Sequence, residues 1–519
     1  MEAGTLLQML QEFLATASAA AVFENGEEIF HFADDSSSAR YSISGERGKA
    51  LLHLWSAERN TVRRVLEAEA KRDRLLLQVQ RFGQAKPSKL EIVRDRDRRT
   101  PAARKAARSS YQQMLGRALE RAFPDWTPGR LSSAMDLERS FGPIYARGML
   151  RRGRSAFAVL GVNAQESQAS IDAALTFGLL WLHACREKHA AQLAVEGLKF
   201  FVPAGSSAVL RERMACLDHS LAKLELYELE ERERALEQMD CADRGNIKTH
   251  LVRCVDQKAT EERFSEATGR VLSLAGVKHT ETELVALSAA ELAFRCHGLE
   301  FARARVAPTD SGFGTVQEIV FGTGANETSL SDETSGLFSS MVRQVFAARR
   351  EGGDHKNALW RMQPERWLEA LVVNNVIAVD DSLDQETVYS QVPAFSASDR
   401  AMIDVLTCTR EGRLAVLELK ADEDIHLPLQ GLDYWARVGW HHARGEFQQY
   451  GYFSGRELSP QPPELVLVAP ALHVHPATDS LLRFLSPEID WTLVGIDERW
   501  REGMRVVFRK RNKSKAAGA

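Results

Sequence analysis

Residues 401–440, AMIDVLTCTREGRLAVLELKADEDIHLPLQGLDYWARVGW, decide the fold of the last third of this chain. Two apolar runs, 402–409 and 414–420, flank the polar segment REGR, whose glycine is typical of the turn of a β-hairpin. We therefore predict two antiparallel strands here. The apolar pattern after Pro428 then predicts a helix that begins near Leu427.

Each predicted strand contains one carboxylate. Antiparallel pairing puts Asp404 opposite or nearly opposite Glu418, and the two-residue period of a strand puts Lys420 on the same face. Carboxylates about 4 Å apart repel each other by roughly 1 kcal/mol in water and 4 kcal/mol near a protein surface. A divalent cation removes this repulsion, and the oxygens of Asp404, Glu418 and the Leu419 main-chain carbonyl suit Mg²⁺, with Mn²⁺ as an alternative.

Lys420 is expected beside a water molecule and a phosphodiester that the cation polarises. A general base would need the pKa of this lysine to fall from about 10.4 to near neutrality, at a cost of roughly 4 to 5 kcal/mol. We therefore expect Lys420 to position the water and the phosphate and to stabilise charge.

The predicted helix carries a stripe of polar residues, namely Gln430, Tyr434, Arg437 and His441. In one interpretation it is a mixed helix face, with Tyr434 packed and Arg437 paired to Asp433. In the other, Gln430 and Tyr434 orient Lys420, the water or a phosphate. Next to the three charges of the hairpin, we favour the second interpretation.

The order Asp404, Glu418-x-Lys420, Gln430-xxx-Tyr434 resembles the PD-(D/E)xK nuclease superfamily, specifically its RecB-like exonuclease branch with a QxxxY motif. The resemblance covers about residues 360–505, and Ile403 stands in the place of the proline. It implies a restriction-endonuclease-like αβββαβ core with a mixed sheet and Mg²⁺-dependent hydrolysis of phosphodiester bonds, most simply in DNA. The strand runs ELVLVAPAL and EIDWTLVGID and the helical pattern HPATDSLLRFL fit that order.

The resemblance also implies a further acid on the helix before the first core strand. The segment PERWLEALV offers Glu365 and Glu369, one turn apart on the same face. We prefer Glu369 as an acid of the metal site, while Glu365, just after Pro364, also fits a solvent-facing capping role.

An internal repeat links this region to an earlier one. AVLGVNAQE at residues 158–166 matches AVLELKADE at 415–423, and three later pairs follow in the same order: GLLW with LDYW, KFFVPAG with LVLVAPA, and LAKLELYELEE with EIDWTLVGIDE. In this alignment Gly161 stands for Glu418, Asn163 for Lys420 and Leu180 for Tyr434. We infer a duplicated domain whose first copy has lost its catalytic charges.

These patterns predict a mixed α+β (α/β) chain of five parts. They are a small β-rich or mixed module (1–95), a degenerate nuclease-like domain (108–235, the upstream domain), a largely helical connector (236–355), a PD-(D/E)xK nuclease-like domain (356–509, the downstream domain) and a basic tail (510–519). In the first module we expect a helix near residues 6–15, strands about a turn at Asn25 and Gly26, and a helix around 49–59. In the connector we expect helices near 261–275, 284–294 and 331–350.

Composition limits the classes of protein and partner. The chain has 519 residues, 44% of them hydrophobic and 27% charged, with a formal net charge of −4, so a nucleic-acid partner would be held by local patches. Six scattered cysteines give no disulfide pattern. No apolar run approaches the roughly 20 residues of a membrane helix, and the N-terminus lacks a secretory pattern, so we expect a cytoplasmic protein without a membrane partner.

The leading hypothesis is a Mg²⁺-dependent nuclease that acts on nucleic acid, most simply DNA in view of the resemblance, with a homodimer as one arrangement that would cut both strands. The alternative from another class is a nuclease-like protein that binds nucleic acid without cleavage. A third interpretation, a structural strand pair with surface charges, does not explain why Asp404, Glu418 and Lys420 share one face.

Overall fold

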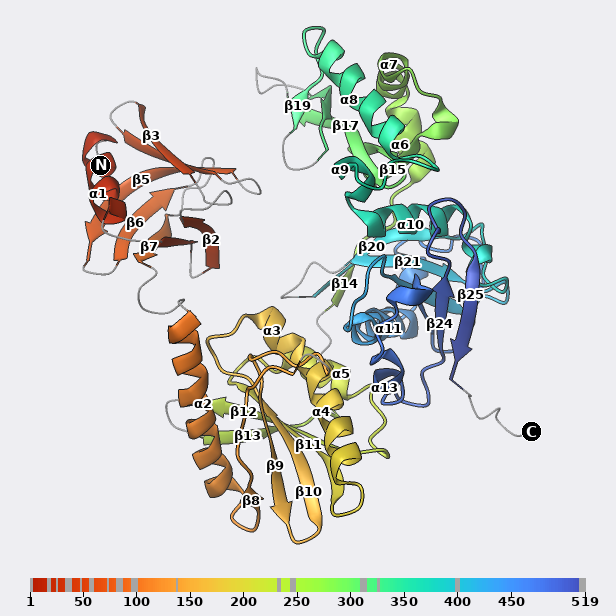
Figure 1. Cartoon of the computed structure of the whole chain (residues 1–519). Coiled ribbons are helices and arrows are strands. Elements are labelled where there is room, and N and C mark those ends of the chain that lie inside the picture. Colours follow the sequence, from red (N-terminus) through yellow and green to blue (C-terminus); the bar gives the residue numbers. More distant parts are fainter. Residues whose placement is uncertain are drawn as a thin grey trace. The chain divides into compact units, whose positions relative to one another are not determined.

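The computed structural model describes the chain except for residues 1–2, 16–19, 25–26, 33–39, 47–48, 56–59, 72–73, 81–86, 95–100, 137–138, 231–234, 243–248, 309–314, 324–326, 397–401 and 513–519. The chain is of mixed α/β class and divides into two compact units, Met1–Tyr111 and Gln112–Ala519 (Figure 1). The predicted turn at Asn25 and Gly26 and most of the predicted basic tail lie outside the described residues. The described start of that tail belongs to a strand.

The first unit is a seven-stranded antiparallel sheet in the order β2-β1-β7-β6-β5-β4-β3, with the helix α1 against β3, β4 and β5. The elements are α1 (Ala3–Ala15), β1 (Ala20–Glu24), β2 (Glu27–Phe32), β3 (Arg40–Glu46), β4 (Lys49–Trp55), β5 (Asn60–Ala70), β6 (Arg74–Gln80) and β7 (Ser88–Arg94). The prediction of a helix around residues 49–59 is wrong, because Lys49–Trp55 form the strand β4. Leu52 and Leu54 are fully buried, and their spacing of two is that of a strand that packs one face on α1.

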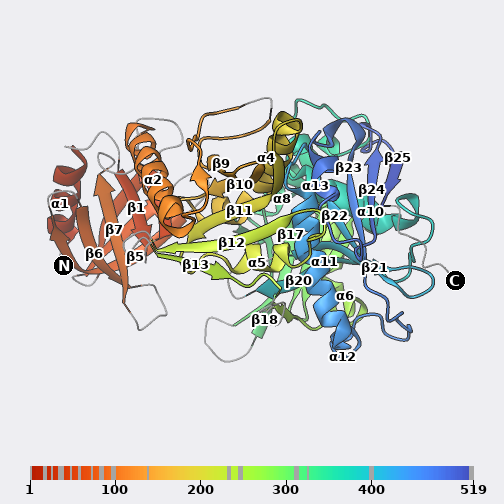
Figure 2. The same cartoon turned by 90° about the horizontal axis from the view of Figure 1, so that it is seen from below.

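The upstream domain opens the second unit. Its six-stranded sheet has the order β13-β12-β11-β10-β9-β8, and α4 lies against β10 and β11 (Figure 2). The elements are α2 (Pro101–Ala122), β8 (Thr127–Pro128), β9 (Ala146–Arg152), β10 (Ser155–Gly161), α3 (Gln168–Asp172), α4 (Ala174–His189), β11 (Ala194–Pro203), α5 (Ala208–Met214), β12 (Lys223–Glu230) and β13 (Ala235–Met239).

The downstream domain contains a seven-stranded sheet in the order β14-β20-β21-β22-β23-β24-β25, of which β14 comes from the preceding connector. Its elements are α10 (Pro364–Asn374), η2 (Val376–Ala378), β20 (Tyr389–Ser396), β21 (Met402–Cys408), β22 (Leu414–Leu419), α11 (Leu427–Ala443), α12 (Glu446–Gln449), β23 (Glu464–Pro470), η3 (Ala471–His473), α13 (Thr478–Leu482), β24 (Trp491–Ile496) and β25 (Val506–Arg511). The helix α11 lies against β22 and β23, and the buried face of α10 packs against β20, β21 and β22.

The two domains share a strand order and a set of strand directions. In the upstream domain β9 and β10 are antiparallel, β10, β11 and β12 are parallel, and β13 is antiparallel to β12. In the downstream domain β21, β22, β23, β24 and β25 repeat this pattern. The helices α4 and α11 occupy equivalent connections, as do α5 and α13. This common topology supports the predicted duplication.

The two domains also pack against each other reciprocally. The helix α5 packs against α11, and α13 packs against the equivalent helix α4. Just after α5 and α13, Leu217 and Leu485 form an antiparallel bridge. There the Asp218 amide donates to the Phe484 carbonyl at 2.8 Å, and the Ser486 amide donates to the Cys216 carbonyl at 2.9 Å. This pairing has the character of a two-fold dimer contact formed within one chain, and one hydrophobic core continues across it.

The connector is a module with its own sheet, so the expectation of a largely helical region is wrong. Its elements are β14 (Thr249–Leu251), α6 (Gln257–Arg263), α7 (Ser265–Ala275), η1 (His279–Glu281), β15 (Glu283–Ser288), β16 (Glu291–Cys296), β17 (Leu299–Pro308), β18 (Thr315–Phe321), β19 (Thr328–Ser329), α8 (Ser335–Ala348) and α9 (Ala358–Arg361). The helices near 261–275 and 331–350 are confirmed. Residues 284–294 are instead a hairpin of the five-stranded antiparallel sheet.

Candidate active site

The hairpin of β21 and β22 has the register that the sequence predicts. Val405 pairs with Leu417 and Cys408 with Leu414, so continuation of the same register would bring Asp404 opposite Glu418. The turn closes at Gly412, whose φ of +83° is a left-handed conformation that glycine adopts without strain. The ladder of paired residues ends at Val405. One residue beyond it, the Asp404 carboxylate accepts a hydrogen bond from the Leu419 amide at 3.0 Å.

Glu418 is the most buried charge of the site. Its side chain comes from the centre of the sheet, on the face covered by α11, and is 2% exposed. The Lys420 ammonium donates to its Oε1 atom at 2.9 Å. Its Oε2 atom is buried and has no hydrogen-bond partner among the residues that the structure describes. Burial, followed by the charge of Asp404, raises the pKa of Glu418 well above its ordinary value.

Asp404 and Lys420 complete this group. Burial raises the pKa of Asp404, although the Leu419 amide and Lys420 both oppose the shift. Burial acts to lower the pKa of Lys420, but the charges of Glu418, Glu365 and Asp404 outweigh burial and raise it. The ammonium therefore stays charged at neutral pH, which matches a positioning role rather than that of a general base.

The donor set fits a hard divalent cation. Two buried carboxylates lie at the edge where the ladder of β21 and β22 ends, beside the main chain of Leu419. One oxygen of Glu418 has no hydrogen-bond partner in the part of the chain that the structure describes. No group of three or more His, Cys, Asp and Glu side chains that could hold a metal ion is found in the described part of the chain. Asp404 and Glu418 contribute only two side chains to the expected set, and Glu369, which we also expected as an acid of the metal site, does not form such a group with them among the described residues.

The helix α11 begins at Leu427, as predicted, and brings Gln430 and Tyr434 to the carboxylates. Gly431 makes this approach possible, because a Cβ atom there would lie 2.5 Å from the Leu467 side chain and 3.5 Å from Glu418 Cβ. Burial, then the charges of Glu418 and Asp404, raise the pKa of Tyr434. The buried Oε1 atom of Gln430 has no hydrogen-bond partner within the described residues.

Both candidate upstream acids lie on α10 near the group. The Glu365 carboxylate is half-exposed and 3.9 Å from the Lys420 ammonium. The Glu369 carboxylate is buried and accepts from Arg366 at 3.1 Å and from Gln391 at 2.7 Å. Burial raises the pKa of Glu369 to about 7, with Arg366 opposing and Asp404 adding to the shift. The two acids therefore differ in role: Glu365 contacts Lys420, and Glu369 is held by its own partners.

Sequence reasoning missed Arg366 and Gln391. Gln391 lies on β20 with a positive φ of 52°, an uncommon conformation for a residue with a side chain, and it donates to Glu369. Arg366 donates a hydrogen bond to Glu369, and its charge opposes the rise that burial causes in the pKa of Asp404. Arg366 could have been found as the residue one turn before Glu369, at i,i+3, whereas no pattern in the sequence distinguishes Gln391.

His441 of the α11 stripe and the neighbouring residue Asp433 have structural partners. Asp433 does not pair with Arg437 as the first interpretation supposed. It binds Arg213 of α5 with two hydrogen bonds, at 2.8 and 2.7 Å, and so ties the two domains together. The His441 ring contacts the Thr249 hydroxyl at 3.0 Å and the Glu446 carboxylate, which joins α11 to β14 and α12.

The structure shifts the predicted correspondence between the domains by one residue. Leu160, not Gly161, lies on the face of β10 that packs with α4, as Glu418 lies on the face of β22 that packs with α11. Gly178 packs against β11 as Gly431 packs against β23. The upstream domain therefore carries apolar or aromatic residues at four of the five matching positions and a basic residue, Arg147, at the fifth. The matches are Leu160 for Glu418, Val162 for Lys420, Arg147 for Asp404, Phe177 for Gln430 and Trp181 for Tyr434.

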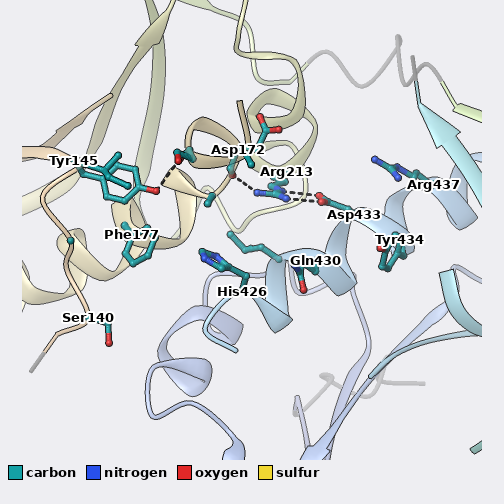
Figure 3. Close-up of a pocket in the computed structure, with 16 residues that line it drawn as sticks. Ser140, Tyr145, Asp172, Phe177, Arg213, His426, Gln430, Asp433, Tyr434 and Arg437 are labelled. Atoms are coloured by element: carbon teal, nitrogen blue, oxygen red, sulfur yellow. Dashed lines mark hydrogen bonds and ion pairs between the residues drawn. The ribbon is translucent and has the colours of Figure 1, made fainter. Parts of the chain in front are cut away.

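Two cavities flank the site. One, of about 700 Å³, lies between the upstream domain and α11 and reaches Gln430 and Tyr434 (Figure 3). The other, of about 800 Å³, lies between the connector and α10, and its lining includes Arg295, Arg366 and Glu369. The first cavity thus borders the residues of the site at Gln430 and Tyr434, and the second borders them at Glu369.

A scan of protein-family models and a search of curated proteins find no match to this chain. Within the described residues, no helix combines the length and the apolarity that a membrane span requires.

Proposed function

We propose that the chain is a metal-dependent nuclease that hydrolyses phosphodiester bonds, most simply in DNA, at the site formed by Asp404, Glu418 and Lys420. The observation that carries this proposal is the pair of buried carboxylates at the end of the β21–β22 ladder. Lys420 binds one oxygen of Glu418, and the other oxygen has no hydrogen-bond partner within the residues described. The order α10, β20, β21, β22, α11, β23 is that of the αβββαβ core that the resemblance implies, and it supports the same assignment.

Asp404, Glu418 and the main-chain carbonyl of Leu419 would hold Mg²⁺ or Mn²⁺. The ion would supply positive charge that offsets the two carboxylates and polarises a phosphodiester. Lys420, kept charged by its acidic neighbours, would donate to the attacking water or to a phosphate oxygen. Gln430 and Tyr434 would orient that water and phosphate from α11, and Glu369 would fix Arg366 beside Asp404.

The basic side chains Arg295 and Arg366 near Glu369 are candidates for contacts with the phosphate backbone. The same cavity also contains Glu281 and Glu283, so these contacts would be local rather than part of a broad basic surface. A protein that binds nucleic acid without cleavage remains the competing function. The upstream domain, which lacks the carboxylates and lysine at the matching positions, fits such a role better than the downstream domain does.

Cleavage assays with the full chain test the proposal. We expect cutting of linear or circular DNA, single-stranded DNA or RNA in Mg²⁺ or Mn²⁺, and no cutting with a chelator. Lys420→Ala should slow cleavage by roughly 100-fold or more, because it removes one preorganised donor to the transition state.

Lys223→Ala is the matched control, since Lys223 forms an exposed ion pair with Glu196 in the upstream domain. Retained binding without cleavage in every metal would assign the chain to the binding class instead. Equal loss of activity in both lysine variants would remove Lys420 from the site.

A further inference from the structure

The cavity between the upstream domain and α11 adjoins the proposed site through Gln430 and Tyr434, and the residues of its upstream wall have no part in the proposed cleavage chemistry. Its downstream wall is the face of α11 that carries Gln430 and Tyr434, and its upstream wall contains Tyr145, Phe177 and Arg213 (Figure 3). The volume of about 700 Å³ falls within the roughly 300 to 1,000 Å³ of pockets that hold small ligands. A nucleotide-sized group fits a space of this volume.

Aromatic rings dominate one side of this cavity. Tyr145 and Phe177 stack with ring centroids 4.8 Å apart, and Phe177 meets His426 edge-on at 5.5 Å. The Tyr145 hydroxyl donates to the Ser170 carbonyl at 2.9 Å, which fixes the ring that backs Phe177. The His426 ring is held by the Thr176 hydroxyl at 3.0 Å. Tyr145 thus covers one face of Phe177, and rings fixed in this way are preorganised for contact with a planar ligand.

The polar lining suits a neutral planar group better than a phosphate. The charge of Arg213 is taken up by Asp433, and the cavity also contains Asp172 and Arg437, so its charged side chains balance. Gln430 lines the cavity, and its buried amide oxygen has no hydrogen-bond partner among the described residues. An amide can both donate to and accept from the edge of a base.

The relation between the two domains explains why the rings lie here. Phe177 occupies the position in α4 that Gln430 occupies in α11, and both line this cavity. The upstream domain has therefore replaced a polar residue of the catalytic pattern by a ring that borders the site of its partner domain.

We propose that this cavity receives one unpaired nucleobase of the strand that is cut, stacked on Phe177 and read by the Gln430 amide. The proposal rests on the proposed nuclease function and adds a substrate class, nucleic acid with an unpaired base near the scissile bond. That base can belong to a single strand or can be flipped out of a duplex.

The test is an abasic scan with the full-length Lys420→Ala chain, so that binding is measured without cutting. Labelled single-stranded oligonucleotides carry an abasic analogue at each position in turn, and affinity is read by fluorescence anisotropy. We expect one or two positions at which loss of the base weakens binding by about 5- to 150-fold, the range measured for base–aromatic stacking. A duplex series shows whether the base is flipped: the same positional effect in the duplex indicates flipping, and its absence there indicates a single strand.

Added to this background, Phe177→Leu should weaken binding of the intact oligonucleotide by a similar factor and abolish the effect of the abasic position, because the two changes remove one interaction. Phe177→Tyr retains a ring and should restore both. Phe123→Leu is the matched control, because Phe123 is a half-buried ring of the same domain that contacts Phe201 and Tyr227.

The base pocket would be overturned if Phe177→Leu and the abasic position weakened binding additively. It would also be overturned if Phe177→Leu and Phe123→Leu weakened binding equally. The chain with Lys420 is assayed in parallel for cleavage in Mg²⁺. Cleavage together with an additive result defeats the base pocket alone, whereas absence of both cleavage and binding defeats the nuclease function and the base pocket with it.

Discussion

Glu418 shows how a single residue is maintained at a cost to the fold. A buried carboxylate beside a second carboxylate is unfavourable without a cation, and burial and Asp404 both raise its pKa accordingly. Leu160 fills the matching position of the upstream domain and is fully buried in its core. The sheet therefore forms without the charge, and chemistry is the better reason for Glu418.

Glu418→Gln should make the metal-free chain more stable, because an amide of the same shape carries no buried charge. We expect a rise of a few degrees in the melting temperature in chelator, corresponding to roughly 1 kcal/mol. Cleavage should be lost in the same variant. A lower melting temperature than that of the unsubstituted chain would show that the Lys420 ion pair contributes more than the burial of charge costs.

Mg²⁺ should raise the melting temperature of the unsubstituted chain and leave that of Asp404→Asn unchanged. A ligand that binds only the folded state stabilises it by about 2.7 kcal/mol at one hundred times its dissociation constant. Glu266→Gln, which removes an exposed acid of α7, should respond to Mg²⁺ as the unsubstituted chain does. If Asp404→Asn gains as much stability as the other two, the ion binds elsewhere.

At this scale, the group Asp404, Glu418, Lys420, Gln430 and Tyr434 was predictable, because strand and helix periods place these residues without knowledge of the whole fold. Arg213 and Gln391 were not. Arg213 reaches Asp433 across 220 positions of sequence, and Gln391 depends on a local backbone conformation that no residue pattern marks.

At the scale of the element, the period of the apolar residues decided which predictions held. The helices α7 and α8 have apolar faces of helical period and were predicted correctly. Residues 284–294 also permit a helical pattern, but they form β15 and β16 because the connector core is shared with β17 and β18. Tertiary packing of a sheet edge is not readable from an eleven-residue window.

The contact between the domains depends on the short segments that follow α5 and α13, and their pairing was not predicted from the sequence. Leu217, 3% exposed, lies in the bridge with Leu485. Leu217→Asp should bury an unpaired charge and destabilise the second unit by more than about 2 kcal/mol, measured by urea denaturation. Leu221→Asp is the control, since Leu221 is four residues later and 45% exposed. Comparable stability of the two variants would mean that the bridge contributes little to the pairing of the domains.

At the scale of the whole molecule, the second unit has one carboxylate site and one domain that lacks the charges at the matching positions. In a homodimer, the arrangement that the sequence left open, two equivalent sites would face the two strands of a duplex. Here the upstream domain already occupies the face of α11 and α13 that a second copy would need. We therefore expect the proposed nuclease to act as a single chain through this face.

A supercoiled plasmid gives a direct test of this arrangement. If the chain cuts duplex DNA, nicked circles should accumulate first, and linear molecules should appear only later, through independent second cuts. Light scattering during gel filtration should give the mass of one chain at the same concentration. Linear product that appears at the rate of the first cut would indicate two cooperating active sites and contradict the single-chain arrangement.

Phe177 in the upstream domain stands at the position that Gln430 occupies in the downstream domain. This difference affects how the sequence of such a molecule can evolve. In a homodimer both subunits come from one gene, so any substitution appears in both of them. An aromatic residue introduced there to bind the substrate would therefore also replace the catalytic residue at that position. Two halves that are encoded separately within one chain escape this coupling. Mutation can adapt one half to hold the substrate while selection preserves the reactive groups of the other.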